Sequence, residues 1–562
     1  MISRRSFLGQ TVATGMSAAT VPASGAMAEV KNRPRRDSSF VEILRMPDSV
    51  TAFSGLDTHL PLQMDGRSFA ARDIMVHVDV QSAELNLRLT APATELTHIH
   101  VRWLAAIHPK IICLGDHWER SYGDLAWRGM VPDRAMPWYF ATHDGSAAHA
   151  YGVKTGAGAM CFWQIDPEGI SVWLDVRNGG DGVLLGSREL HAATVVTRRG
   201  AANESPMVAL RSFCGRMSPA PRLLKTAVYG VNDWYYAYGK NNQNMLLRMA
   251  DLVAELAPPA GPRPYAVVDE GWKDGSATFP SMASYAAQVK QRGVHPGIWI
   301  RPLRAMPGAD PKLLLPNKRF GERASRYQEL AFDPTIAEAL ALVTRQAKDT
   351  ADWGFELVKH DYSTYDLLGQ WGFEMGATPT LPGWHFNDRT RTNAEIILDL
   401  YNALRTAVGD RTAILGCNTV GHLGAGVFEM QRTGDDVGGM WDRTRRMGVN
   451  TLAYRLPQHG TFFHLDADCV AITKAAPWEM TRQWLDVVAR SRTTLFISPE
   501  EGEVGAEQRA ALRQAFAEVT APGPGAEPAD FVHDTTPEDW KQSSGLKHYS
   551  WSGAAGASPF PV

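Results

Sequence analysis

The chain has 562 residues, 44% of them hydrophobic and 21% charged, and its formal net charge at pH 7 is −3. This composition is typical of a globular protein with two or three domains, and the slightly acidic balance excludes an extended nucleic-acid-binding surface. No run reaches the ~20 apolar residues of a membrane span, so no membrane association is predicted.

The first 28 residues have the features of an export signal. Arg4 and Arg5 stand in the setting SRRSFL, a mildly apolar run follows, and the small-residue sequence Ala26-Met27-Ala28 ends it. This order is typical of a twin-arginine (Tat) signal peptide, here cleaved after Ala28, although a disordered basic tail is an alternative. The sequence therefore predicts a periplasmic or secreted mature protein.

The cysteines do not form a recognisable framework. Their number is odd, and no two stand in a C-x-x-C pair: they are Cys113, Cys161, Cys214, Cys417 and Cys469. In a chain that the Tat system would export already folded, this pattern argues against structural disulfides and against a zinc site. Neither a metal nor a cofactor is predicted.

Residues 29–222 are predicted to form an antiparallel β-sandwich. Short alternating segments such as MVHVDV, LNLRLT, GAMCFWQI and SVWLDV are separated by clusters of Gly, Pro, Asn and Asp. Many short strands at this spacing are typical of a sandwich domain. Its tryptophans are expected mainly in the core.

Residues 223–520 follow a different rhythm, in which apolar strands alternate with amphipathic helices such as AEIILDLYNALRTAV. Eight strand candidates follow one another: TAVYGVNDW, PYAVVDE, HPGIWIRP, FELVKHD, RTAILGCN, VFEMQRTGDD, GTFFHLDAD and TTLFISP. This pattern predicts a TIM (β/α)8 barrel. An open doubly wound sheet is the alternative, but the segment lacks its glycine-rich phosphate loop. Residues 521–562 are predicted to form a short β or irregular C-terminal segment.

Polar residues follow six of these strands. They are Asn232, Asp233 and Trp234; Asp269 and Glu270; Lys359 and Asp361; Cys417 and Asn418; Arg432, Asp435 and Asp436; and Asp466 and Asp468. The carboxyl ends of barrel strands carry the chemistry of barrel enzymes, so these residues predict one site.

The fourth strand ends in Lys359-His360-Asp361, a charged sequence after apolar residues. Because side chains alternate along a strand, Lys359 and Asp361 should face the site, whereas His360 should point to the helical layer as a structural histidine. An adjacent ammonium lowers the pKa of a carboxyl group, which predicts Asp361 as an ionised nucleophile.

Asp361 and Asp436 together suit a retaining glycoside hydrolase. In that mechanism one carboxylate attacks the anomeric carbon and the other, held protonated, protonates the leaving oxygen. A structural salt-bridge network around Lys359 and Arg432 is an alternative. A metal site at His464, Asp466 and Asp468 is another, but it offers too few oxygens for calcium.

The strand ends resemble those of a known family. GVNDWYYAYG, VVDEGW and HPGIWIRP are similar to the first three strand segments of the melibiase-like α-galactosidases, glycoside hydrolase families 36 and 27. Lys359-His360-Asp361 resembles their K-x-D nucleophile motif, and Arg432 to Asp436 resembles their R-x-x-x-D acid/base motif. HLDADCVAI is similar to the segment that usually reads N-D-P-D-M-L. The resemblance spans the predicted barrel, and the β-rich region in front is similar to the amino-terminal sandwich of family 36.

The resemblance implies catalysis by Asp361 and Asp436 and a set of substrate-binding residues. Trp234 would form an apolar wall, Asp269 and Glu270 would bind the distal hydroxyls, and Lys359 would bind a ring hydroxyl. Arg432, with Cys417 or Asn418, would hold the region of the 2-hydroxyl. Trp299, in the third strand segment, and Asp468, the second acid of the seventh, complete the implied set.

Glu270 departs from the family pattern, which usually has Asp there, and so do Asn418 and the short C-terminal region. α-Galactosides are the implied substrates, and α-N-acetylgalactosamine, β-arabinopyranose, α-glucose and β-galactose remain alternatives. A non-catalytic carbohydrate-binding protein is a further one. The expected partner is an oligosaccharide or glycoside, and an oligomer is left open.

Overall fold

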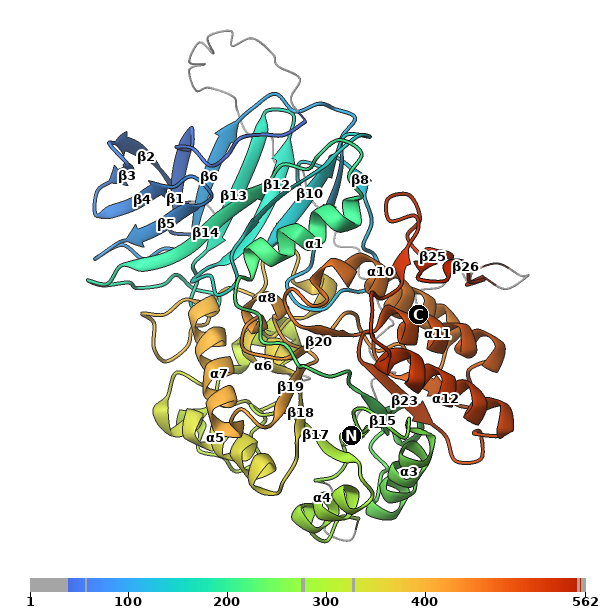
Figure 1. The fold of residues 1–562 in the computed structure, drawn as a ribbon. Coiled ribbons are helices and arrows are strands. Elements are labelled where there is room, and N and C mark those ends of the chain that lie inside the picture. The colour runs from blue at the N-terminus through green and yellow to red at the C-terminus, as the bar shows by residue number, and fades with distance from the viewer. Residues whose placement is uncertain (1–38, 56–57, 274–277, 326–328, 553–555, 557–562) are drawn as a thin grey trace. The chain divides into compact units, whose positions relative to one another are not determined.

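A computed structural model describes residues 39–55, 58–273, 278–325, 329–552 and 556 (Figure 1). The predicted Tat signal lies outside these residues. Residues 37–562 are grouped in one compact unit, so the two large sheets described below belong to the same body.

The first part of the described chain is antiparallel, as predicted. In β5 (Leu85–Thr90), and in β4 (Ile74–Val80) from Ile74 to Val78, every second side chain is buried, which is the period of a strand with one face on a core. The other strands are β1 (Ser49–Phe53), β2 (His59–Asp65), β3 (Ser68–Ala71), β6 (His98–Leu104), β7 (Ile112–Gly115), β8 (Arg128–Gly129), β9 (Met136–Pro137), β10 (Tyr139–His143), β11 (Ala148–Val153), β12 (Met160–Asp166), β13 (Gly169–Asp175) and β14 (Leu190–Arg198).

These strands pair in the order β8-β7-β10-β11-β14-β5-β4-β3-β2-β1-β6-β13-β12-β9. The two halves of this order face one another, because the rings of Phe140 in β10 and Trp163 in β12 lie 5.7 Å apart although their strands are not paired. The arrangement is sandwich-like, as predicted.

A helix, α1 (Pro206–Met217), ends this region and was not predicted. It buries Met207, Leu210, Phe213 and Met217, at spacings of three and four residues, and a proline occupies its first turn. Both features favour a helix, so the sequence pattern carried the signal.

The second large sheet is parallel. All eight strand predictions are confirmed, and a ninth strand, β22, follows the seventh segment. The order is β21-β20-β19-β18-β17-β16-β15-β23-β22. The bounds are β15 (Tyr229–Asn232), β16 (Tyr265–Val268), β17 (His295–Ile300), β18 (Leu357–His360), β19 (Ala413–Gly416), β20 (Met430–Arg432), β21 (His464–Asp466), β22 (Val470–Ile472) and β23 (Leu495–Pro499).

Helices alternate with these strands, and the longer ones flank the sheet (Figure 1). In α7, the predicted amphipathic segment begins at a capping box between Thr392 and Glu395, which satisfies two free N–H groups. The bounds are α2 (Trp234–Ala237), α3 (Gln243–Leu256), α4 (Met282–Gln291), α5 (Ala337–Asp352), α6 (Ser363–Leu368), α7 (Asn393–Val408), α8 (Gly421–Gly424), α9 (Trp441–Arg443), α10 (Thr451–Arg455), α11 (Trp478–Ser491) and α12 (Ala506–Thr520).

The parallel sheet curls, and β21 at one edge approaches the start of β23. Asp466, the last residue of β21, forms a parallel bridge with Thr494, the residue before β23. The amide of Thr494 also donates a hydrogen bond to the carbonyl oxygen of Leu465, at 2.8 Å. β15, the first predicted strand, pairs in parallel with β23, the eighth. The bridge from Asp466 brings β21, the seventh, next to the start of β23.

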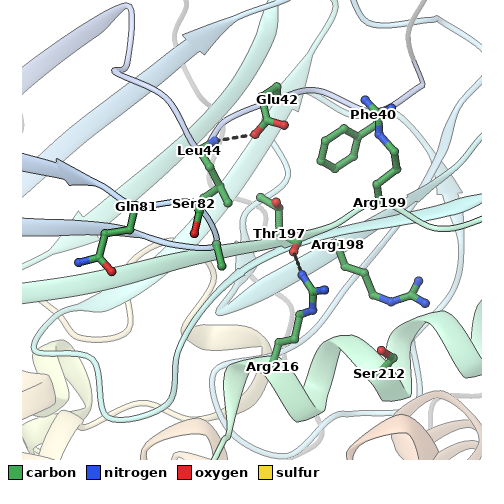
Figure 2. Close-up of a pocket in the computed structure, with 11 residues that line it drawn as sticks. Phe40, Glu42, Leu44, Gln81, Ser82, Thr197, Arg198, Arg199, Ser212 and Arg216 are labelled. Carbon is green, nitrogen blue, oxygen red and sulfur yellow. Dashed lines mark hydrogen bonds between the residues drawn. The ribbon is translucent and has the colours of Figure 1, made fainter.

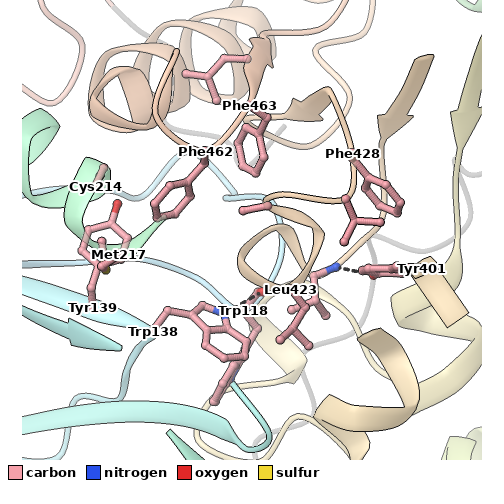
Figure 3. Close-up of a cluster of buried hydrophobic side chains, with 14 of the residues drawn as sticks. Trp118, Trp138, Tyr139, Cys214, Met217, Tyr401, Leu423, Phe428, Phe462 and Phe463 are labelled. Carbon is pink, nitrogen blue, oxygen red and sulfur yellow. Dashed lines mark hydrogen bonds between the residues drawn. The ribbon is translucent and has the colours of Figure 1, made fainter. Parts of the chain in front are cut away.

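The hydrophobic core runs from the sandwich into the parallel-sheet region (Figure 3). Trp118 and Trp138 come from the sandwich, and Leu423 comes from α8. The ring of His422 stacks on that of Trp138, with centroids 4.6 Å apart and an interplanar angle of 9°. The two regions thus share buried surface rather than a solvated linker.

The C-terminal segment adds a three-stranded antiparallel sheet of β24 (Glu527–Pro528), β25 (Asp539–Gln542) and β26 (Gly545–His548). Trp540, in β25, and Trp551, which follows β26, are both buried. All five cysteines fall within the described residues, and each is a buried, unbridged thiol. Over the same residues, no helix has the length and apolar character to cross a membrane.

Candidate active site

The predicted site residues come together at the carboxyl ends of the parallel strands. We call the following residues the strand-end cluster: Asn232, Asp269, Lys359, Asp361, Cys417, Asn418, Arg432, Asp436 and Asp468. All except Asp436 are buried, and hydrogen bonds or ion pairs link each of them to another polar group. Charge buried at this density needs internal partners or a chemical use.

Asp361 follows β18 directly and is 3% exposed. Its carboxylate accepts hydrogen bonds from three N–H groups: the indole of Trp299 at 3.0 Å, the amide of Tyr362 at 2.8 Å and the amide of Asn418 at 3.1 Å. These donors fix the orientation of the carboxylate and stabilise its negative charge. The geometry therefore suits an attacking carboxylate.

Lys359 pairs with a different carboxylate from the one predicted. Its Nζ donates to Oδ2 of Asp269 at 2.6 Å, and the amide of Asn232 donates to the same oxygen at 2.8 Å. Burial lowers the pKa of Lys359, but the negative charge of Asp269 raises it by more than burial lowers it. The pKa of Lys359 therefore lies well above its ordinary value. Lys359, predicted to pair with Asp361, thus pairs instead with Asp269, which follows a strand two positions away in the sheet.

Glu270 lies beside this pair at the end of β16. It is half-buried, and its amide donates to Oδ1 of Asp269 at 2.8 Å. Trp234 is also half-buried, at the start of α2, with its ring 5.5 Å from that of Tyr238. Both residues are therefore at the strand ends, as predicted.

Arg432 joins the other half of the cluster. Its guanidinium lies 2.7 Å from Oδ2 of Asp468, 3.4 Å from Oδ1 of Asp436 and 3.4 Å from Sγ of Cys417. Asp468 also accepts from the hydroxyl of Tyr235 and, at 2.9 Å, from the amide of Val437. Asp468 is thus an internal anchor for Arg432.

Asp436 is the more accessible of the two predicted catalytic carboxylates, with a side chain 16% exposed. Besides Arg432, the guanidinium of Arg120 lies 3.7 Å from its Oδ1. Two guanidinium groups thus lie within 4 Å of this carboxylate. Partial exposure lets Asp436 exchange protons with water.

The sandwich supplies residues to this site that the sequence did not predict. The segment 116–127, which we call the sandwich loop, places Arg120 2.7 Å from Asp435. The backbone amide of Ser121 donates to the carbonyl of Thr433 at 2.9 Å, and Glu119 accepts from the side-chain amide of Asn418. These residues lie in the run HWERSY, which carries no catalytic or binding motif, so no signal in the sequence marked them.

His360 points to the helical layer, as predicted. Its ring lies 5.6 Å from Tyr401 and 5.5 Å from Phe428, and its Nε2 shares a hydrogen bond with Ser363. Burial lowers the pKa of His360 to about 3, so the ring is neutral. It is a core residue of the fold.

The proposed metal face on the seventh strand is not formed. His464 shares a hydrogen bond with the carbonyl of Leu224 at 3.1 Å, and Asp468 has a left-handed backbone (φ 74°) that interrupts the alternation. Burial raises the pKa of Asp466 to about 6. Within the described ranges, no three His, Cys, Asp or Glu side chains are grouped as metal ligands would be.

A pocket of about 700 Å³ lies on the sandwich and α1, away from the strand-end cluster (Figure 2). Phe40, Thr197, Arg199 and Arg216 are among its lining residues, and the guanidinium of Arg199 covers the ring of Phe40 at 4.7 Å. The pocket shares no residue with the strand-end cluster.

Comparison with known proteins found similarity of fold to solved structures and no similarity of sequence to a described family. No protein-family model matches the sequence, and no curated protein matches it. The α-galactosidase TtGalA from Thermus thermophilus, solved with p-nitrophenyl α-D-galactopyranoside, has a TM-score of 0.59 at 16% identity, over 89% of this chain and 99% of that one.

Two structures of family 36 α-galactosidase AgaA variants from Geobacillus stearothermophilus are also similar. The one bound to 1-deoxygalactonojirimycin has a TM-score of 0.54 at 12% identity, over 80% of this chain and 68% of that one. The one bound to raffinose has a TM-score of 0.52 at 11% identity, over 84% and 73%. The chain therefore has a fold like that of family 36, in keeping with the resemblance of its strand-end motifs.

Proposed function

We propose that the protein is a retaining exo-glycoside hydrolase that removes terminal sugars, with α-galactosides as its substrates. One observation carries the proposal. Asp361 is buried at a strand end, where three N–H groups orient it, in the same cluster as the more exposed Asp436. The likeness of the fold to family 36 α-galactosidases supports it.

In this mechanism Asp361 attacks the anomeric carbon and forms a glycosyl-enzyme intermediate, while Asp436 gives a proton to the leaving oxygen. In the second step Asp436 takes a proton from water, and that water releases the sugar from Asp361. No cofactor is needed for either step.

The remaining cluster residues would bind the sugar. Lys359, held by Asp269, would donate to a ring hydroxyl, and Asp269 and Glu270 would accept from the distal hydroxyls. Trp234 and Trp299 would line the apolar face of the ring. Arg432, Cys417 and Asn418 would surround the 2-hydroxyl, with Asp468 holding Arg432 in place.

The proposal includes a closed (β/α)8 barrel over residues 223–520, preceded by a sandwich over residues 29–222 and followed by the C-terminal segment 521–562. The contact between β21 and the residue before β23 supports closure. In such a barrel the carboxyl ends of the strands carry the site, which is where the strand-end cluster lies.

A related glycosidase for another sugar is the second candidate, and Glu270 favours it. The longer side chain of Glu270 lies next to Asp269, where the resemblance implies contact with the distal hydroxyls. A site that hydrogen-bonds hydroxyls rejects sugars that present them differently. The identity of this residue therefore bears on the choice among the sugars.

A panel of aryl glycosides tests the function. We expect the mature protein to release p-nitrophenol from the α-galactoside faster than from the α-N-acetylgalactosaminide, β-arabinopyranoside, α-glucoside or β-galactoside. Faster release from another member of the panel would identify the protein as a glycosidase for that sugar, which is the second candidate function. Binding of galactosides without release from any member would instead identify a carbohydrate-binding protein.

We also propose export to the periplasm by the Tat system, on the evidence of the first 28 residues. Replacing Arg4 and Arg5 by lysine should leave the uncleaved precursor in the cytoplasm, as measured by immunoblotting of cell fractions. Normal delivery of that variant would overturn the proposal.

A further inference from the structure

A group of partly exposed aromatic side chains stands beside the two carboxylates. We call residues 369–376, which follow α6, the aromatic segment. Trp371 in this segment is half-buried, and Phe373 is 62% exposed. The ring of Trp371 lies 5.8 Å from that of Tyr362, whose amide donates to Asp361. The aromatic segment therefore adjoins the proposed nucleophile.

The sandwich loop holds this segment in place. Glu119 accepts a hydrogen bond from the amide of Gly372 at 3.0 Å, and the indole of Trp118 donates to the carbonyl of Gly376 at 2.7 Å. The ring of Tyr122 lies 5.4 Å from that of Phe373. Phe373 is thus exposed on an anchored segment, and its exposure is a feature of a fixed surface.

Arg120 connects the aromatic segment to the proposed acid/base. Its guanidinium carbon lies 5.9 Å from the ring centre of Trp371, and its Nη1 lies 3.7 Å from Oδ1 of Asp436. Asp435, at 2.7 Å, fixes the guanidinium. One side chain therefore spans the distance between Trp371 and Asp436.

The chemistry of this surface fits a sugar ring. The C–H face of a pyranose or furanose packs on an indole or phenyl ring, and its hydroxyls accept hydrogen bonds from a guanidinium. In glycoside hydrolysis the leaving sugar departs beside the acid, because that residue protonates its oxygen. A ring that leaves beside Asp436 would therefore meet Arg120 and Trp371.

We propose that Trp371, Phe373 and Arg120 form a leaving-group subsite that takes the second sugar ring of an oligosaccharide. This proposal rests on the function proposed above. It specifies the substrate class as glycosides whose leaving group is itself a sugar, and it makes the sandwich loop part of the substrate site.

Two substrates that differ in the leaving group test the subsite. α-Galactosyl fluoride has no leaving-group ring, whereas the leaving group of raffinose is a disaccharide, whose first ring would occupy the subsite. We expect Trp371→Ala to lower the ratio of kcat/KM for raffinose to kcat/KM for the fluoride about tenfold or more. Trp371→Phe, which keeps a ring face, should lower the ratio less. Phe53→Ala, at a half-buried ring on β1 of the sandwich, is the matched control and should leave the ratio as in the wild type.

An unchanged ratio in Trp371→Ala would overturn the subsite. Turnover of the fluoride measures folding of each variant, and if Trp371→Ala does not fold, Phe373→Ala replaces it because that side chain is exposed. A few-fold fall in its ratio supports the subsite, and no fall overturns it. A wild type that hydrolyses the fluoride but not raffinose overturns the subsite alone. A wild type that hydrolyses neither overturns the proposed function as well.

Discussion

At the scale of single residues, the two proposed catalytic carboxylates have different surroundings. Asp361 is buried and accepts from three neutral N–H groups, whereas Asp436 is partly exposed and lies near the guanidinium groups of Arg432 and Arg120. A fixed carboxylate suits attack, and an accessible one suits proton exchange. Removing either should therefore impair a different step.

Asp361→Ala should lose nearly all turnover on every substrate, because no glycosyl-enzyme can form. Asp436→Ala should retain the first step for a dinitrophenyl glycoside, whose leaving group needs little protonation. Added azide should then speed Asp436→Ala and give a glycosyl azide of the substrate's own anomeric configuration, as measured by NMR.

Asp352→Ala, at an exposed residue paired with Lys348, serves as the control and should behave as the wild type. A wild-type product of inverted configuration, observed before mutarotation, would contradict the assignment of Asp361 as nucleophile.

Glu270→Asp tests which sugar the distal side of the site selects. The substitution withdraws the carboxylate by one methylene group, so the hydroxyls it binds must be presented differently. We expect the preference among the aryl glycosides to shift by ~1–3 kcal/mol, measured as ratios of kcat/KM. An identical ranking in both proteins would show that Glu270 does not contact the sugar.

At the scale of elements, the parallel strands were predictable because each is a short apolar run that ends in polar residues. The charged ends of β16 and β18 marked the site before any contact was known. The pairing of Lys359 with Asp269 was not predictable, because it joins strands that are 90 residues apart in the chain and separated by β17.

The sandwich loop was missed for a related reason. No local sequence pattern around Glu119 and Arg120 indicates a site. They join the site only because the folded loop contacts Thr433 and Asn418. The break after β21 was also hidden, because the alternation in HLDAD continues through Asp468, where the backbone turns left-handed. Tertiary contacts decided these features, and local propensity did not.

Gly372→Ala tests the anchoring of the aromatic segment. Gly372 has φ 59°, and an added Cβ would lie 2.8 Å from the ring of Tyr122. The methyl group must therefore push the segment away from the sandwich loop, at a cost of ~1–3 kcal/mol. We expect kcat/KM for raffinose to fall several-fold.

The matched control is Gly376→Ala. That residue also has a positive φ, 45°, but an added Cβ would have no neighbour within 4 Å. It should therefore show the backbone strain without the clash. Equal losses of kcat/KM in the two variants would indicate that contact with Tyr122 does not position the segment.

At the scale of the whole molecule, the sandwich and the parallel-sheet region depend on one another through a shared core. His422 of α8 stacks on Trp138 of the sandwich, and burial lowers the pKa of His422 to about 4. Its folded pKa is thus below the unfolded value of ~6.5. The stability it contributes is complete above pH 6.5 and is lost as the pH falls toward 4.

His422→Gln should therefore weaken the acid sensitivity of the fold. Between pH 6.5 and 5, His422 takes up a proton in the unfolded chain but not in the folded one, which lowers the free energy of unfolding of the wild type by up to ~2 kcal/mol. The variant lacks this histidine, so its free energy of unfolding does not fall for this reason. We expect Tm, measured by calorimetry at pH 7 and pH 5, to fall less in His422→Gln than in the wild type. His533→Gln, at an exposed histidine, should show the wild-type fall. Equal falls in all three proteins would contradict a neutral, buried His422.

The buried thiols have a consequence for where the chain can fold. Cys113 and Cys417 have pKa values raised to about 12 by burial, so the reactive thiolate is scarce. None of the five cysteines, all of which lie in the described residues, forms a disulfide bond. Folding of the described residues therefore requires no oxidative step, whichever compartment it takes place in.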